Sequence, residues 1–167
     1  MPFIDPNTLP YRSGVGIVLL NADGLVWIGR RFDADLNDAE GGSWQMPQGG
    51  IDENEEPSAA ARRELYEETG IRSVEVLARS QDWIKYEIPP ELVGKALKGK
   101  YRGQRQLWFA MRFLGEEDEI NLSLHGRTPE FDAWRWATAR EVLGVIVGFK
   151  RPAYEAVFTE FKSFIAA

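Results

Sequence analysis

Three glutamates, Glu64, Glu67 and Glu68, have the spacing in this chain that is best suited to chemistry. In a helix, side chains three and four positions apart share one face, so these carboxylates would lie within an arc of roughly 100°. Like charges at these spacings repel by about 0.2–0.5 kcal/mol per pair, and we expect no basic residue on that face to relieve the repulsion. A divalent cation would relieve it, and oxygen-only ligands favour Mg²⁺ or Mn²⁺. The alternative interpretation is an acidic face exposed to solvent.

The sequence predicts a rigid element under these acids. Residues 57–68 are strong helix formers with a proline in the first turn, where it is tolerated, and Gly70 is placed as a left-handed cap. Residues 44–46 predict a short strand before the helix. Between strand and helix, Gly49 and Gly50 would let the backbone approach a ligand closely. The unit would therefore present the carboxylates beside a loop that can contact a ligand.

The rest of the chain predicts an α/β fold. Residues 15–20 and 25–28 predict a hairpin, residues 74–88 one or two strands, and residues 106–113 and 131–136 two more. The polar residues 33–42 predict a loop. A last helix opens at Pro152, and its apolar residues recur at helical steps: Tyr154, Val157, Phe158, Phe161 and Ile165. Strands before, between and after helices favour a mixed sheet covered by helices.

Composition narrows the possible chemistry. A length of 167 residues fits one domain, residues 1–167. The absence of cysteine excludes disulfides, zinc–thiolate sites and cysteine nucleophiles, and the single histidine, His125, for which we expect no catalytic role, excludes multi-histidine metal sites. A net charge of −6 argues against a protein that coats nucleic acid. With no apolar run near the roughly 20 residues of a membrane span, and no signal peptide, we expect a cytoplasmic monomer with no membrane contact.

Taken together, residues 49–71 resemble the Nudix box. The matching positions are Gly49, five residues, Glu55, seven residues, Arg63-Glu64-Leu65, one residue, Glu67-Glu68, one residue and Gly70-Ile71. Because so many specified positions match in a strand–loop–helix context, the signal is a strong one. The resemblance implies a Nudix fold, with a mixed sheet sandwiched between helices (α/β/α). It also implies a Mg²⁺- or Mn²⁺-dependent hydrolase of nucleoside diphosphates linked to another moiety.

The resemblance also implies roles for single residues. Glu67 and Glu68 match the metal-binding pair of the family, and Glu64 matches a third ligand that often serves as general base. We therefore expect Glu64 and Glu68 to be catalytic. The expected metal-binding set is Gly49, Glu64, Glu67, Glu68 and Glu130. The expected structural residues of the motif are Glu55, Arg63 and Gly70.

Outside the box, the chain is similar to one branch of the family from about residue 11 to residue 165. That branch contains dinucleoside polyphosphate hydrolases and bacterial RNA pyrophosphohydrolases. The motifs that carry the likeness are Tyr11-Arg12, Trp44-Gln45-Met46-Pro47-Gln48-Gly49-Gly50, Gly103-Gln104-Arg105-Gln106, Pro129-Glu130-Phe131 with Trp134 and Trp136, and Phe149-Lys150-Arg151-Pro152. The loop over residues 33–42 departs from the compact members. The resemblance implies these substrate-binding residues: Arg12, Arg31, Tyr86, Gln104, Phe149 and Lys150. For each of them, an ordinary surface or strand role is the alternative.

A basic cluster and two substrates complete the prediction. Within eleven residues that contain no acid lie Lys95, Lys98, Lys100, Arg102 and Arg105. Such a patch can steer a polyanion, although a solvated loop is the alternative. The leading substrate is a dinucleoside polyphosphate such as diadenosine tetraphosphate, split asymmetrically. The alternative is the triphosphorylated 5′ end of RNA, losing pyrophosphate. A catalytically silent nucleotide- or protein-binding module is a third hypothesis, which the intact box acids disfavour.

Overall fold

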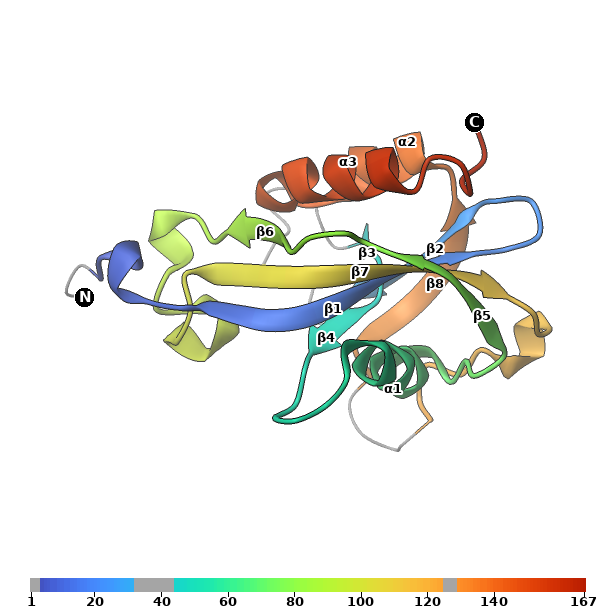
Figure 1. Cartoon of the computed structure of the whole chain (residues 1–167), viewed down its shortest axis with the longest axis horizontal. Coiled ribbons are helices and arrows are strands. Elements are labelled where there is room, and N and C mark those ends of the chain that lie inside the picture. Colours follow the sequence, from blue (N-terminus) through green and yellow to red (C-terminus); the bar gives the residue numbers. More distant parts are fainter. Residues whose placement is uncertain (1–3, 32–43, 125–128) are drawn as a thin grey trace.

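The computed structural model describes residues 4–31, 44–124 and 129–167. The predicted loop over residues 33–42 and His125 lie outside the described residues. Figure 1 shows one layer of strands with helix α1 (Pro57–Thr69) on one face and helices α2 (Ala139–Val145) and α3 (Arg151–Glu160) on the other. The predicted α/β/α arrangement is confirmed.

The strands of the described chain belong to one mixed sheet. They are β1 (Tyr11–Leu20), β2 (Val26–Arg31), β3 (Trp44–Gln45), β4 (Gln48–Gly50), β5 (Val74–Arg79), β6 (Ile84–Glu87), β7 (Gly103–Phe113) and β8 (Phe131–Ala137). The path β3-β2-β1-β7-β5 forms its centre, while β4 pairs with β1, β6 with β7 and β8 with β2. Strands β1 and β7 run parallel, with Tyr11 opposite Gly103 and Leu20 opposite Arg112.

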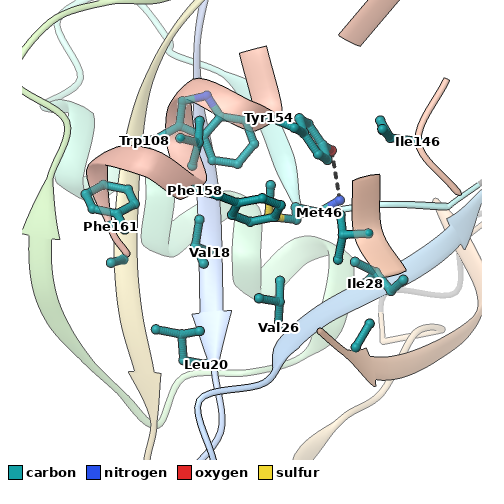
Figure 2. Packing of buried hydrophobic residues seen from close by; sticks show 14 residues of the cluster. Val18, Leu20, Val26, Ile28, Met46, Trp108, Ile146, Tyr154, Phe158 and Phe161 are labelled. Carbon is teal, nitrogen blue, oxygen red and sulfur yellow. Dashed lines mark hydrogen bonds between the residues drawn. The ribbon is translucent and has the colours of Figure 1, made fainter. Parts of the chain in front are cut away.

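The central strand β1 is buried on both faces, which explains its continuous apolar run. Val18 and Leu20 point toward α3, where they join a cluster with Trp108 and Tyr154 that Figure 2 shows. The alternate residues of β1, together with Leu65 of α1, join the cluster on the opposite face. These two apolar layers hold α1 and α3 at set positions over the sheet, and α1 carries the acids.

Several sequence predictions are confirmed locally. The hairpin forms with Leu20 opposite Val26. Helix α1 covers the predicted range, and Gly70 caps it with a left-handed φ of 76°. Strand β4 and helix α2 were not predicted, because a strand of three residues and a helix of seven are too short to show a period. The one local sign of α2 is the capping box between Thr138 and Glu141.

Candidate active site

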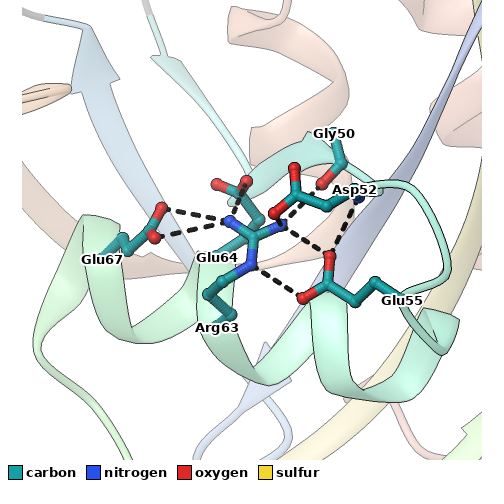
Figure 3. A network of polar contacts seen from close by, with 6 residues as sticks. All are labelled: Gly50, Asp52, Glu55, Arg63, Glu64 and Glu67. Atoms are coloured by element: carbon teal, nitrogen blue, oxygen red, sulfur yellow. Dashed lines mark hydrogen bonds and ion pairs between the residues drawn. The ribbon is translucent and has the colours of Figure 1, made fainter.

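Arg63 is the hub of the polar network on α1, shown in Figure 3. Its Nε donates to Glu55 Oε2 at 2.8 Å, and its Nη2 donates to the carbonyl oxygen of Gly50 at 2.9 Å. Its Nη1 lies 2.9 Å from Glu64 Oε1 and 3.3 Å from Glu67 Oε2. The expectation that no basic residue relieves the acidic face is therefore wrong. Arg63 precedes Glu67 by four positions and contacts two of the three carboxylates.

Glu55, one of the residues expected to be structural in the motif, contacts both the loop before α1 and the helix. Besides the bond from Arg63, its Oε1 accepts the backbone N–H of Asp52 at 3.0 Å. These donors favour the charged carboxylate, so the pKa of Glu55 falls to about 2. The loop that begins at Gly50 is thus held to α1 by charged hydrogen bonds at both of its ends.

Glu68 lies in a different environment from Glu55. It is 8% exposed, and its Oε2 has no hydrogen-bond partner among the described residues. Burial, followed by the negative charges of Glu130 and Glu64, raises its pKa well above the usual range. Burial also raises the pKa of Glu64, although the hydrogen bond from Arg63 opposes the shift. These carboxylates repel one another, and Glu68 is buried, which is the situation that a bound cation relieves.

The donor set fits a divalent metal ion in its chemistry. An orphaned, buried carboxylate oxygen facing other carboxylates is suited to a hard cation such as Mg²⁺ or Mn²⁺. Among the described residues, no three acidic groups already converge into a complete cage. Arg63 is bonded to Glu64 Oε1 and to Glu67 instead, so the guanidinium competes with an ion for these oxygens.

Gly49 makes room for the carboxylate of Glu64. A Cβ at Gly49 would lie 1.9 Å from Cδ and 2.1 Å from Oε2 of Glu64. Strand β4 sets this approach through its pairing with β1, where Val15 stands opposite Gly49. The glycine that the resemblance places in the metal set therefore allows an acid to pack directly on the backbone.

A pocket of about 560 Å³ joins the acids to the predicted substrate-binding residues. All six of these line it: Arg12, Arg31, Tyr86, Gln104, Phe149 and Lys150. Gly49, Glu64, Glu68 and Glu130 line the same pocket, whereas Glu67 does not. Residues from far apart in the sequence meet here because β1 and β7 are parallel neighbours. Their register places Arg12 opposite Gln104, and β6 places Tyr86 opposite Gln104 from the other side.

Glutamines, most of which were not predicted as site residues, form a polar floor of the pocket. Gln104 Nε2 donates to the Tyr86 hydroxyl at 2.7 Å, and Gln106 Nε2 donates to Gln48 Oε1 at 3.0 Å. Burial raises the pKa of Tyr86 to about 12, which keeps its hydroxyl protonated. Gln45 and Gln48 line the pocket without having been predicted to do so. The available signal was the position of glutamines at strand sites where an apolar residue is usual.

Lys150 is a buried cation on the opposite wall. Its side chain is only 6% exposed, and its Nζ donates to Gln45 Oε1 at 3.2 Å. Burial, and next the positive charge of Arg31, lower its pKa to about 8. Its neighbour Phe149 has its ring centroid 5.7 Å from that of Tyr86. The wall therefore combines a cation with an aromatic face.

The predicted basic patch is divided between two places. Lys95 and Lys98 line the pocket, and Lys100 does not. Arg102 pairs with Glu87 at 3.0 Å. Arg105 donates to Ser13 Oγ at 2.9 Å and lies 4.3 Å from the ring of Trp83. Of the five basic residues, the structure thus brings only two to the pocket.

Comparison with known proteins identifies the family. The model of the NUDIX domain matches residues 10–157. This chain belongs to the Nudix family. RNA pyrophosphohydrolases of Brucella anthropi and Brucella ovis are both 53% identical to it, over 98% of this chain and 96% and 94% of theirs. The chain is thus a Nudix hydrolase acting on pyrophosphate bonds, and the hypothesis of a catalytically silent module is set aside. Nudix hydrolases generally use divalent metal ions.

Solved structures of other Nudix proteins share the fold. The dihydroneopterin triphosphate pyrophosphohydrolase of E. coli has a TM-score of 0.65 at 22% identity, covering 90% of this chain and 99% of that one. A binary complex of the C. elegans Ap4A hydrolase has a TM-score of 0.62 at 16% identity, covering 91% and 98%. At these identities the likeness concerns the fold alone. No helix in the described part of this Nudix protein is long and apolar enough to cross a membrane.

Proposed function

We propose that this Nudix hydrolase removes pyrophosphate from the triphosphorylated 5′ end of RNA. The observation that carries the proposal is the 53% identity, over nearly the whole chain, to proteins named RNA pyrophosphohydrolase. Motif likeness alone favoured a dinucleoside polyphosphate as the leading substrate, and the comparisons support the alternative better. Dinucleoside polyphosphates remain the second candidate, because they also present a polyphosphate followed by a nucleoside.

In this proposal, the box acids hold the metal and one of them handles the proton. Gly49, Glu64, Glu67, Glu68 and Glu130 form the binding set for Mg²⁺ or Mn²⁺. When bound, the metal neutralises charge on the phosphate oxygens and lowers the pKa of water. Glu64 accepts the proton of the attacking water. Its raised pKa and its position against Gly49 support this role, since a general base works best with a pKa near the working pH and in a set position.

The remaining pocket residues bind the substrate. Arg12, Arg31 and Lys150 offset the charge of the triphosphate, while Phe149 stacks on the first base. A ring face grips a flat base without reading its identity. The protonated hydroxyl of Tyr86, held by Gln104, can donate to a phosphate oxygen. Tyr86, Gln104 and Lys150 are buried, which strengthens their interaction with phosphate, because the protein interior screens charge less than water does.

The test compares substrates under identical Mg²⁺ concentrations. Purified protein is given a triphosphate-ended RNA and diadenosine tetraphosphate, and kcat/KM is measured for each. We expect the RNA to be preferred by at least about tenfold and a Glu67→Gln variant to lose about 10²-fold or more on RNA. Preference for diadenosine tetraphosphate would overturn the substrate assignment. Wild-type turnover by Glu67→Gln would remove the metal assignment.

A further inference from the structure

One wall of the pocket has no role in the proposed chemistry. It is the segment that joins β6 to β7 at the end of the sheet near the N-terminal residues (Figure 1). Leu92, Lys95, Leu97 and Lys98 of this segment line the pocket, next to Ile88 at the end of β6. The wall therefore presents two ammonium groups beside an apolar surface.

The backbone of this wall is held in a strained form. Leu97 has φ 52° and ψ 42°, and Lys98 has φ 60° and ψ 18°, a left-handed region that non-glycine residues rarely adopt. The segment closes on itself, because a Cβ at Gly99 would lie 2.7 Å from the carbonyl oxygen of Gly94. Such strain persists only where its surroundings maintain it, and it is concentrated at binding sites. Here both strained residues line the pocket.

The cations of the pocket fall into two groups. Arg12 interacts electrostatically with Glu64, and Arg31 interacts electrostatically with Lys150. Lys150 also interacts with the charges of Glu68 and Glu130. Neither Lys95 nor Lys98 is among the main electrostatic neighbours of Glu64, Glu68 or Lys150. The first group suits a triphosphate beside the acids. The second group, Lys95 and Lys98, suits a phosphate at another position along the substrate. Ile88 and Leu97 line the pocket with it and offer an apolar surface to a sugar or base.

We propose that Lys95 and Lys98 bind the phosphodiester that follows the first nucleotide of the RNA. This inference rests on the proposed function and adds a subsite for the RNA chain itself. A nucleoside triphosphate lacks this phosphodiester, so the lysines distinguish a chain from a mononucleotide. Each phosphate contact on a single strand contributes about 0.7 to the slope of log affinity against log salt.

The experiment measures pyrophosphate release from a nucleoside triphosphate and from triphosphate-ended RNAs of two and four nucleotides. The variant is Lys95→Gln/Lys98→Gln. The matched control is Lys100→Gln/Lys162→Gln, which removes the same charge at exposed positions that do not line the pocket. We expect kcat/KM of the variant to fall about tenfold on both RNAs. On the nucleoside triphosphate, we expect it to fall by no more than about twofold. The salt slope of log KM on RNA should fall by about 0.7, the value for one phosphate contact on a single strand.

The outcomes separate this inference from the proposed function. An equal loss on the nucleoside triphosphate and the RNAs would place the lysines on the polyphosphate and overturn the inference. An equal loss of kcat/KM in the control Lys100→Gln/Lys162→Gln would show that the effect depends only on net charge, and it would overturn the inference. A wild-type protein that releases no pyrophosphate from any RNA would overturn the proposed function, and this subsite with it. Retained RNA turnover by Lys98→Arg, with an unchanged thermal midpoint in all variants, would confirm that charge and not folding is responsible.

Discussion

Replacing Gly49 by alanine tests whether Glu64 must sit against the β4 backbone. The added Cβ would lie 1.9 Å from Cδ of Glu64, so the carboxylate must move by about 1.5 Å to reach ordinary contact at 3.4 Å. The φ of Gly49 is not positive, so alanine adds no backbone strain. Misplacing a catalytic group by 1 Å can lower the rate about 10²-fold, or about 2.7 kcal/mol in the activation barrier. We expect kcat to fall by that factor.

The assay is single-turnover pyrophosphate release from triphosphate-ended RNA at saturating Mg²⁺. Gly144→Ala is the control, because nothing lies within 4 Å of its new methyl group, and helix α2 should gain up to about 1 kcal/mol. The double variant Gly49→Ala/Glu64→Ala should be no slower than Glu64→Ala alone, since both changes act through one carboxylate. Rates for Gly49→Ala within twofold of wild type, or losses that add in the double variant, would refute the reasoning.

Three further changes test single groups of the site. Glu55→Gln should lower the free energy of unfolding by about 1–3 kcal/mol, because Arg63 loses its charged acceptor. The pKa of Glu55 is about 2 in the folded protein and 4.5 ordinarily, so its contribution to stability is complete above pH 4.5 and disappears toward pH 2. Urea titrations of the wild type that show no such decline in the free energy of unfolding would contradict this. Glu68→Gln should raise the thermal midpoint in EDTA, because it removes a buried carboxyl group whose pKa burial has raised. The same variant should lose about 10²-fold in Mg²⁺-dependent turnover. A lower midpoint would argue against an uncompensated carboxylate. Because the pKa of Lys150 is about 8, kcat/KM of the wild type should decline as pH rises through 8. Lys150→Arg should abolish this decline, because a guanidinium stays charged. An unaltered pH profile in the variant would assign the decline to another group.

The box could be recognised from sequence because its contacts are local. Glu55, Arg63 and Glu67 interact across eight residues or fewer, so helical spacing and one loop are enough to bring them together. The same locality explains the confirmed cap at Gly70. The wrong expectation, that nothing neutralises the acidic face, came from overlooking Arg63 four positions before Glu67. An (i, i+4) pair of this kind is readable from sequence alone.

The pocket wall was only partly predictable. The six residues expected from the resemblance to bind substrate all line the pocket, but Gln45 and Gln48 were not predicted, because a glutamine at a strand site does not by itself show which pocket it lines. Nor could composition divide the basic cluster, because the direction of each side chain depends on strand register. Lys95 lies in the segment between β6 and β7 and lines the pocket. Arg105 lies on β7, opposite Ser13 of β1 and Lys85 of β6, and is next to Gln104, so its side chain is on the other face of the sheet.

By itself, the sequence determined the helix that carries the acids, its cap, the glycine beside it and the chemistry these residues can perform. All of these follow from spacing within about twenty residues. The tertiary structure decided which distant groups share that site. The parallel pairing of β1 with β7 brings Arg12 to Gln104 across ninety-two positions in the chain. Packing of the two apolar layers then buries Glu68 and Lys150, and the loss of water around them shifts both pKa values.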